Sequence, residues 1–448
     1  MEIPLLLAVL AGIALLLFLI LKLKIQAFLA LLIVCIVVGL LAGLPALEIM
    51  ETMKEGMGST LGFVATVVGL GALFGGILEQ SGSARKLAST ILAKTGEKRA
   101  PWAMMLTGFA VAIPVFFDVA FIILVPVTYA LSKKTGKSLL LYALPLLAGL
   151  AITHAFIPPT PGPIAVADIL GADLGWVILF GFLAGLPAAI IGGPIFARYI
   201  SKRIYVEAGH FTEPEEENIE NPPSAGLILL IIFVPIVLIV LSTLINSPFF
   251  EQSKIPSGIV YTISLLGHPF TALIIANLLA WYFIGIRRGM GKEFLLKVAT
   301  SSFQAAGIII LLTGAGGAFK QILIVTGAGE MIAGSLNNTM FNPILFGFIV
   351  ALLIRVLQGS ATVAMITAAG ITAPVIAGAS YSMPHISLIV IAIAAGASSF
   401  SHVNDSGFWL VGQYLGLSEK QTFGSWTVMT SLIALVGLMV SLLLWYLI

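Results

Sequence analysis

The sequence predicts an all-α polytopic membrane protein made of two inverted-topology repeats, each with about five transmembrane helices and one re-entrant hairpin. Composition is the first observation: 59% of the 448 residues are apolar and 9% are charged, whereas about 25% of the residues of a soluble domain are charged. The second observation is a series of long apolar runs, and the third is an internal repeat. This composition excludes disordered chains, fibrous folds and nucleic-acid-binding proteins.

About ten apolar runs are long enough, or nearly long enough, to cross a bilayer. They cover residues 3–21, 26–44, 59–80, 138–171, 174–198, 224–246, 265–285, 300–325, 384–415 and 422–446. The first run follows Glu2 without a basic segment. We therefore expect a retained helix there rather than a cleaved signal peptide.

Two further apolar stretches, residues 101–131 and 341–376, are too long for one crossing and awkward for two. Polar or helix-breaking residues interrupt each of them near its middle. We interpret each stretch as a re-entrant hairpin that enters and leaves the membrane on the same side, with its tip near Asp118 or Ser360.

The distribution of basic residues predicts the orientation, because cytoplasmic loops are rich in Lys and Arg. The loops at 22–24, 81–100, 132–137, 198–223, 286–299 and 416–421 hold 18 of the 22 Lys and Arg residues. Both termini are therefore expected outside the cytoplasm. Residues 205–223, with six Glu and no Lys or Arg, are expected to form a cytoplasmic acidic linker between the first repeat, 1–204, and the second, 224–448.

The two halves match in order when one is shifted by about 245 residues. Gly71-Ala-Leu-Phe aligns with Gly316-Gly-Ala-Phe, and Thr153-His aligns with Ser401-His. With an odd number of crossings in each half, the halves must lie upside down relative to each other. Inverted repeats are typical of secondary transporters, which bind substrate near the bilayer midplane where broken helices meet.

Carboxylates inside apolar segments are costly and often functional. Asp118 follows Ile-Pro-Val-Phe-Phe at the break of the first hairpin, and Asp405 lies in a polar break of the second half. Both are candidate proton-coupling residues, because a carboxylic acid removed from water holds its proton more readily. Glu79 and Asp168 are more simply interpreted as an interfacial ion-pair partner and a helix cap.

The tip of the second hairpin reads Arg355-Val-Leu-Gln-Gly-Ser-Ala-Thr. Small hydroxyl residues at a chain break expose hydroxyl and N–H donors together, which suits an anionic oxygen. The alternative is a helix kink that its own Ser and Thr satisfy. Arg355 either pairs with an acid of the protein or neutralises a substrate carboxylate.

Two more helix breaks carry polar residues. One runs from Thr153 to Pro163 and has four Pro and a Gly in its last six residues, so it cannot stay helical. The other, from Ser398 to Gly407, carries seven polar side chains. Unwound backbone at this depth persists where it lines a cavity. The predicted substrate-binding residues are Thr153, His154, Thr160, Gln358, Gly359, Ser360, Thr362, Ser399, Ser401, His402 and Asn404.

No cofactor or metal site is predicted. The single cysteine, Cys35, lies in an apolar run, and the five His residues are scattered without an HExxH motif. The two His residues at the breaks could instead be packed, hydrogen-bonded residues.

The three break motifs resemble those of the gluconate permease (GntP) family of proton symporters, within the ion transporter superfamily. The motifs are Ile-Pro-Val-Phe-Phe-Asp118-Val, Thr-His154-Ala-Phe-Ile-Pro-Pro-Thr-Pro-Gly-Pro and Ser-His402-Val-Asn-Asp-Ser-Gly-Phe-Trp. The resemblance runs over essentially the whole chain. It implies uptake of gluconate or another small hydroxylated monocarboxylate with protons at the bacterial inner membrane. It also implies a homodimer with scaffold and transport domains that works as an elevator.

Other functions stay open at this point. Relatives that carry glycerate or D-serine allow a different symporter of the same family. A cation/proton antiporter would need no organic substrate. An intramembrane enzyme could use Ser360 or His402, but no nucleophile–base motif is recognisable. The partners expected are an anionic small molecule, protons, the lipid bilayer and a second copy of the chain.

Overall fold

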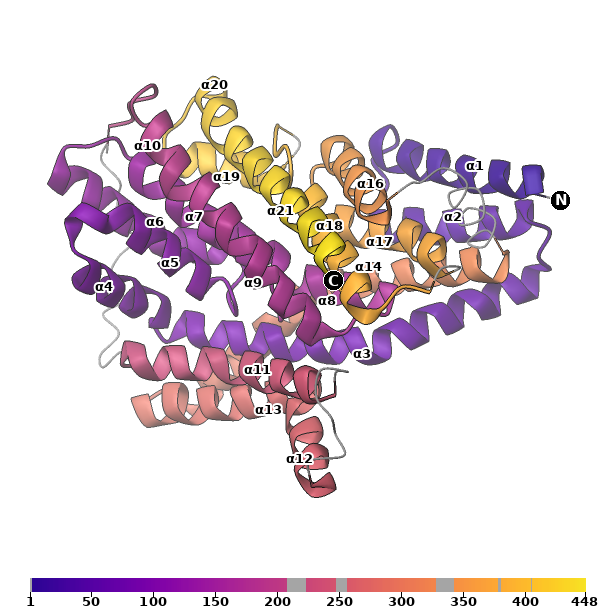
Figure 1. Cartoon of the computed structure of the whole chain (residues 1–448), viewed down its shortest axis with the longest axis horizontal. Helices are drawn as coiled ribbons and strands as arrows, with labels where there is room; N and C mark the ends of the chain where they lie inside the picture. The colour runs from indigo at the N-terminus through magenta and orange to yellow at the C-terminus, as the bar shows by residue number, and fades with distance from the viewer. Residues whose placement is uncertain (1, 208–222, 247–255, 328–341, 378–379, 404) are drawn as a thin grey trace.

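The computed structural model describes residues 2–207, 223–246, 256–327, 342–377, 380–403 and 405–448. Every regular element in these ranges is a helix (Figure 1), so the prediction of an all-α fold is confirmed for them. Seven helical stretches are long and apolar enough to cross a membrane. They are Ala46–Gln80, Leu140–Leu170, Leu174–Ile200, Ala225–Ile245, Pro269–Arg288, Lys292–Val325 and Glu419–Leu447.

The first half contains ten α-helices. They are α1 (Glu2–Leu21), α2 (Ala27–Leu41), α3 (Ala46–Gln80), α4 (Ser83–Thr95), α5 (Ala100–Val111), α6 (Phe117–Thr135), α7 (Leu140–Phe156), α8 (Pro161–Leu170), α9 (Leu174–Ile190) and α10 (Phe196–Ile200). A π-helical turn, Ile191–Ile195, joins the last two.

The described part of the second half also has one long helix, followed by two interrupted pairs of helices. Its α-helices are α11 (Ala225–Ile245), α12 (Ser257–Gly267), α13 (Pro269–Leu279), α14 (Lys292–Val325), α16 (Pro343–Gln358), α17 (Ala361–Ala377), α18 (Met383–Ser398), α19 (Ser406–Tyr414), α20 (Glu419–Thr422) and α21 (Val428–Leu447). Each half has one long helix, of 35 residues in α3 and 34 in α14. In each half the long helix comes before two pairs of helices, and a short non-helical break separates the two members of each pair. The pairs are α5/α6 and α7/α8 in the first half, and α16/α17 and α18/α19 in the second. The inverted orientation of the halves stays a prediction.

Seven stretches are fewer than the ten or so crossings predicted, because several apolar helices are short. The run at 26–44 contains a helix of 15 residues, α2. The run at 384–415 is divided between α18 and α19, since residues 399–403 and Asp405 are not helical. The number of crossings therefore stays a prediction.

The breaks follow from local chemistry. α7 ends before Pro158 and Pro159, which have no N–H to continue a helix. α8 then begins with Pro161 in its first turn, where a missing N–H costs little. α16 ends at Gly359, whose φ of +91° is a left-handed conformation that glycine adopts without strain.

The long helices α3 and α14 pack along each other, and glycines allow the close approach. Gly317 of α14 lies directly against Thr60 of α3. Further along α3, a Cβ on Gly71 would lie 3.0 Å from the carbonyl oxygen of Pro159, and one on Gly75 would collide with that of Pro114. α3 therefore supports both breaks of the first half through positions that have no side chain.

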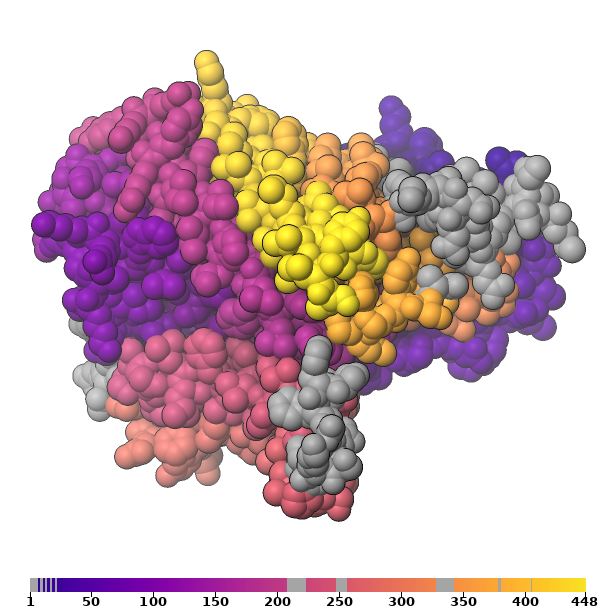
Figure 2. Space-filling view, in the orientation of Figure 1, coloured from indigo at the N-terminus to yellow at the C-terminus, as the bar shows by residue number. Residues whose placement is uncertain are grey.

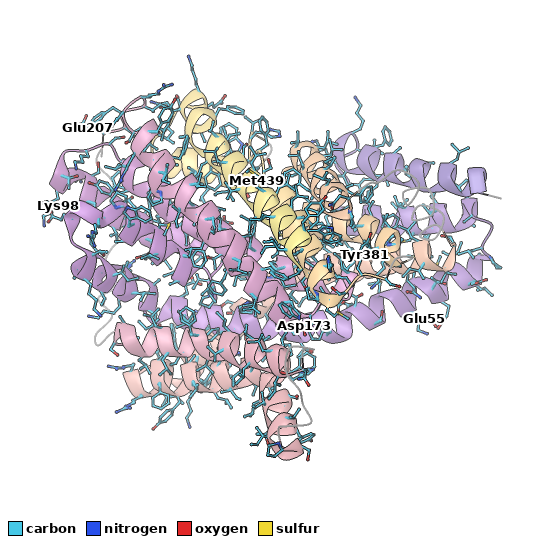
Figure 3. The ribbon with its side chains drawn as sticks, in the orientation of Figure 1. Glu55, Lys98, Asp173, Glu207, Tyr381 and Met439 are labelled. Atoms are coloured by element: carbon cyan, nitrogen blue, oxygen red, sulfur yellow. The ribbon has the colours of Figure 1, made fainter. Side chains whose placement is uncertain are left out.

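The remaining helices close the molecule around these breaks. In the space-filling view the C-terminal helix α21 lies against α9, which joins the two halves on this face (Figure 2). Asp173, labelled in Figure 3, caps α9 and accepts a hydrogen bond of 2.7 Å from Thr243 of α11. The start of the predicted linker packs on the α6–α7 loop, where Val206 N donates to Ser138 Oγ at 3.1 Å. Residues 208–222 of that linker lie outside the described residues.

Candidate functional site

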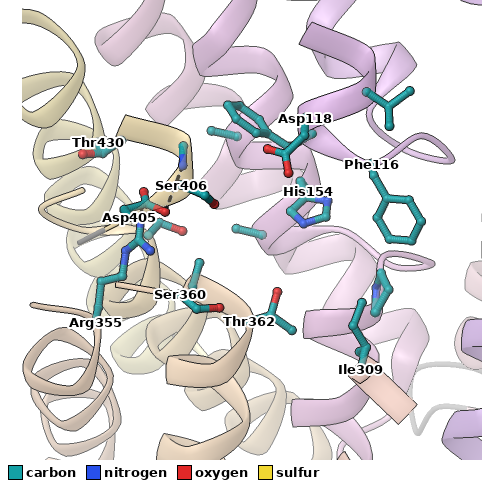
Figure 4. Close-up of a pocket in the computed structure, with 18 of the residues that line it drawn as sticks. Phe116, Asp118, His154, Ile309, Arg355, Ser360, Thr362, Asp405, Ser406 and Thr430 are labelled. Atoms are coloured by element: carbon teal, nitrogen blue, oxygen red, sulfur yellow. Dashed lines mark hydrogen bonds and ion pairs between the residues drawn. The ribbon is translucent and has the colours of Figure 1, made fainter. Parts of the chain in front are cut away.

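Four helix breaks meet at one cavity of about 410 Å³ (Figure 4). They lie between α5 and α6, α7 and α8, α16 and α17, and α18 and α19. Its walls come from the starts of α6, α8, α17 and α19, the ends of α7, α16 and α18, and the neighbouring parts of α14 and α21. This volume lies within the range of small-molecule sites, about 300–1,000 Å³. A site assembled from helix ends is possible because each break exposes backbone groups that a continuous helix would use internally.

Four helices begin at the cavity wall, and a helix start carries partial positive charge. Two of these starts have few free donors: α8 has Pro161 and Pro163 in its first turn, and Asp405 caps α19 by accepting from Gly407 N at 3.1 Å. The start of α6 has no side-chain cap. At α17 the Ser360 hydroxyl accepts only a long bond, 3.4 Å, from Val363 N. The starts of α6 and α17 therefore offer N–H donors to a bound anion.

Arg355 and Asp405 form a buried ion pair on one side of the cavity (Figure 4). Their exposed fractions are 4% and 7%. The second guanidinium nitrogen of Arg355 donates to the Gly359 carbonyl oxygen, and the Ser401 hydroxyl donates to Asp405 Oδ2. Arg355 was expected either to pair with an acid of the protein or to neutralise a substrate carboxylate. In the structure it pairs with an acid of the protein, Asp405. The ionised form of Asp405 is fully compensated there.

Asp118 differs from Asp405 in its surroundings. It lies in the first turn of α6, is exposed to the cavity, and lies with His154 across from the ion pair (Figure 4). Within the described ranges no hydrogen bond or ion pair engages its carboxylate. Asp118 and Asp405 both line the cavity, and Arg355 offsets the charge of only one of them, Asp405. Asp118 is therefore the cavity carboxylate whose charge no described residue compensates.

Hydroxyl groups and one imidazole complete the polar lining. The hydroxyl residues are Ser360, Thr362, Ser398, Ser406 and Thr430. His154 contributes from the last turn of α7, with its ring 6.2 Å from that of Phe116. Its buried Nδ1 has no hydrogen-bond partner within the described chain. The lining thus combines hydrogen-bonding side chains with apolar surface.

Of the predicted substrate-binding residues, His154, Ser360 and Thr362 line the cavity. Most of the others support the breaks behind it. Thr153 Oγ1 donates to Phe109 O at 2.9 Å, and Thr160 Oγ1 donates to Ile157 O at 2.7 Å. His402 Nε2 lies 2.8 Å from Val356 O, so this histidine is a packed, hydrogen-bonded residue.

The remaining predicted residues have other surroundings. Gly359 ends α16, Ser399 is buried at the end of α18, and the buried Oε1 of Gln358 has no partner in the part of the chain described. Asn404 lies outside the described residues.

Two other expectations change. Asp168 is not a helix cap, because it lies inside α8, whereas Asp173 caps the next helix. Glu79 accepts a hydrogen bond from Gln80 at 3.4 Å, and among the described residues no basic side chain lies within ion-pair distance of it.

Sequence reasoning missed the contributions of two continuous helical segments. Ala305 and Ile309 of α14 line the cavity, and so do Trp426 and Thr430 near the start of α21. Trp426 Nε1 donates to Ser401 Oγ at 2.6 Å, and the centre of its ring lies 5.6 Å from that of Phe117, with the two planes tilted by 34°. The only sequence signal was the spacing of Trp and Thr on one face of the last apolar run.

Known permeases are similar to this chain over nearly its whole length. The family model described as GntP family permease matches residues 3–448. The low-affinity gluconate transporter of Escherichia coli (strain K12) is 39% identical over 441 residues, which cover 98% of each chain. The gluconate permease of Pseudomonas aeruginosa is 38% identical over 438 residues, covering 95% of this chain and 94% of that one.

The fold also resembles a solved structure. Neisseria gonorrhoeae MtrF, of a class of antimetabolite efflux pumps, superposes with a TM-score of 0.67 at 15% identity, covering 92% of this chain and 93% of MtrF. At that identity the likeness shows the fold alone.

Proposed function

We propose that this chain, which belongs to the GntP permease family, imports gluconate or a closely related hydroxylated monocarboxylate together with protons. It is a multi-pass membrane transporter and not an enzyme. The observation that carries the proposal is the convergence of four helix breaks on one polar cavity. We place the protein in a bacterial inner membrane, with both termini outside the cytoplasm.

The substrate carboxylate binds at the starts of α17 and α6. Ser360 and Thr362 stand at the first of these starts and offer hydroxyl donors beside the free N–H groups. Arg355 is already held by Asp405 and Gly359. Among the described residues that line the cavity there is no Lys and no second Arg. A site with helix-end donors and no free cation suits one negative charge better than two.

The hydroxyl groups of the substrate bind the remaining polar lining. Ser398, Ser406, Thr430 and His154 surround the rest of the cavity and can each donate or accept. Trp426 and Phe117 offer apolar surface to the carbon chain. This division of the cavity favours a polyol with a single carboxylate over a dicarboxylate, which would need a second cationic contact.

Asp118 carries the coupled proton. With its charge uncompensated, a negatively charged substrate repels the ionised carboxylate and favours the protonated acid. By linkage, a proton on Asp118 then improves the binding of the substrate by the same factor. Asp405 is the weaker candidate, because Arg355, Ser401 and Gly407 all hold its ionised form.

The halves 1–204 and 224–448 work as inverted repeats of a homodimeric elevator, with separate scaffold and transport domains, joined by the cytoplasmic segment 205–223. In each half a long helix, α3 or α14, comes before two interrupted pairs of helices, and the two long helices pack on each other. These features support this architecture. The excess of Lys and Arg in the predicted cytoplasmic loops supports the orientation.

Two alternatives have a specific observation in their favour. Asp118 could pair with an ammonium group, as in D-serine, and the pair of cavity carboxylates could serve a cation/proton antiporter.

Labelled gluconate, glycerate and D-serine should be offered to proteoliposomes containing the purified protein, with an acidic exterior. We expect gluconate to accumulate most strongly and succinate to compete poorly. Preferential uptake of D-serine, or cation exchange without any sugar acid, would overturn the proposal.

A further inference from the structure

One hydroxyl group behind the cavity connects two side chains that line it. Ser401 is 1% exposed and is not among the cavity-lining residues. Its hydroxyl accepts from Trp426 Nε1 at 2.6 Å and donates to Asp405 Oδ2. Both Trp426 and Asp405 line the cavity. Ser401 therefore reaches the cavity through two neighbours, without facing it.

The chemistry of the three groups fixes the direction of both hydrogen bonds. An indole N–H only donates and an ionised carboxylate only accepts, whereas a hydroxyl does both. The hydroxyl of Ser401 can therefore serve Trp426 and Asp405 at the same time. Ser401→Ala would leave the indole N–H and one carboxylate oxygen without this partner. A buried polar group that loses its partner keeps the cost of its removal from water.

Other groups hold the backbone of Ser401. Its N–H donates to Thr430 Oγ1 at 3.3 Å, and its carbonyl oxygen accepts from the Thr427 hydroxyl. Thr427 is the last residue of a π-helical turn, Phe423–Thr427, that precedes α21. These bonds do not use the Ser401 hydroxyl. Removing that hydroxyl should therefore leave the α18–α19 break attached to the start of α21.

On the side of Asp405, the connection continues to the proposed carboxylate site. Asp405 accepts from Arg355, which also donates to the carbonyl oxygen of Gly359. Gly359 ends α16 directly before Ser360, at the start of α17. The orientation of Asp405 therefore affects the position of the donors proposed to bind the substrate carboxylate.

On the side of Trp426, the connection reaches the first half of the chain. The Trp426 ring is 5.6 Å, centre to centre, from the ring of Phe117. Phe117 lies in the first turn of α6, next to Asp118. An indole ring that is held by its N–H keeps one orientation, in which its apolar body faces Phe117 and the cavity.

We propose that Ser401 is a positioning residue that fixes the orientations of Trp426 and Asp405 together. It thereby sets both the apolar surface that meets the carbon chain of the substrate and the donors that meet its carboxylate. The inference rests on the proposed function for the identity of the ligand. It replaces the direct substrate contact that the motif around Ser401 predicts.

The test compares gluconate with glycerate, which also has one carboxylate but a shorter carbon chain. Affinities are measured on folded, purified wild type and Ser401→Ala. A displaced carboxylate site weakens both ligands, whereas a displaced indole weakens mainly the longer one. We expect Ser401→Ala to weaken gluconate binding about tenfold, or about 1.4 kcal/mol, and glycerate binding about threefold. A role in folding alone would lower the unfolding midpoint and leave the ratio of the two affinities unchanged, which would overturn the proposal.

A double-variant cycle separates the indole N–H from its ring. Trp426→Phe keeps an aromatic ring, removes the N–H and should weaken gluconate binding about threefold. In the Ser401→Ala background the N–H has no partner to lose, so the combined variant should bind within about twofold of Ser401→Ala alone. If the two effects simply add, the ring acts without Ser401 and the proposal is wrong.

Trp409→Phe is the matched control. Trp409 Nε1 donates to Val403 O at 2.7 Å, so this variant loses the same kind of bond at the same break. The Trp409 side chain is 48% exposed and does not line the cavity. Trp409→Phe should bind both ligands like wild type. If it weakens gluconate binding as much as Trp426→Phe does, the bond to Ser401 has no special role.

Two further outcomes also decide the proposal. If Ser401→Ala does not fold, Trp426→Phe decides: weaker gluconate binding supports the proposal, and binding like that of wild type overturns it. If wild type binds neither gluconate nor glycerate, the proposed function has failed instead. The thermal unfolding midpoints of the four proteins of the cycle then decide, where effects smaller than their sum support the shared hydroxyl and additive effects contradict it.

Discussion

Replacing each cavity carboxylate by its amide should produce two different defects. Asp405 accepts from Arg355, Ser401 and the N–H of Gly407, and it is 7% exposed. Asp405→Asn leaves the buried Arg355 charge uncompensated, which costs about 3–5 kcal/mol. That is a large part of a total stability of about 5–15 kcal/mol. Asp118→Asn removes a cavity-exposed carboxylate without partners in the described chain, so its stability change should stay within about 0.5 kcal/mol.

The transport defects should be reversed. With one proton carried per substrate, a gradient of one pH unit supplies about 1.4 kcal/mol, which allows about tenfold accumulation. Asp118→Asn has no carboxylic acid to carry that proton, so its accumulation ratio should fall to about one. Exchange of bound substrate needs no net proton movement and should continue. Correctly folded Asp405→Asn should retain part of the gradient-driven accumulation.

Both properties can be measured on the same purified proteins. Thermal unfolding in detergent gives the stability difference. Proteoliposomes with equal amounts of protein give gradient-driven accumulation, and preloaded vesicles give exchange. If Asp118→Asn accumulates gluconate like wild type, Asp118 does not carry the proton. If Asp405→Asn does so as well, neither carboxylate couples transport, and His154 is the next candidate.

Three further predictions concern the binding wall and the architecture. Ser360→Ala should raise the KM for gluconate several-fold without uncoupling transport, because it removes a hydroxyl donor at the start of α17. An unchanged KM would mean that the substrate carboxylate binds elsewhere. Gly75→Ala should destabilise the protein by about 1–3 kcal/mol, because its methyl group would collide with the backbone of the α5–α6 break. The control Gly58→Ala faces open space and should leave stability unchanged. Equal unfolding midpoints for the two variants would contradict this. Cysteines replacing Glu97 and Thr135 should react with an impermeant reagent from the same side of the membrane, and labelling from opposite sides would exclude a re-entrant hairpin.

The positions of the helix breaks could be predicted because their causes are local. Pro158 and Pro159 end a helix through their missing N–H groups, and Gly359 ends one through its left-handed backbone. Polar residues at 399–405 interrupt an apolar run that would otherwise continue. Each cause acts within a few residues, so the sequence was sufficient to locate four breaks and the acids beside them.

The direction of each side chain could not be predicted in the same way. Thr153 and Ser401 belong to predicted motifs, yet their hydroxyls hold neighbouring segments together behind the cavity. Trp426 and Ile309 belong to continuous helices without a recognisable motif, yet they line it. Which face of a helix meets the cavity depends on the packing of the whole bundle, and no short motif encodes that.

The sequence by itself determined that this is a helical membrane protein with interrupted helices and with acids at two of the breaks. Composition and backbone chemistry decide those properties, and both can be read from a linear chain. The tertiary structure alone decided that Arg355 compensates Asp405, fifty residues away, and that Asp118 has no such partner among the residues that the structure describes. The physical reason is that charge compensation depends on distances through space, which exist only once the helices have packed.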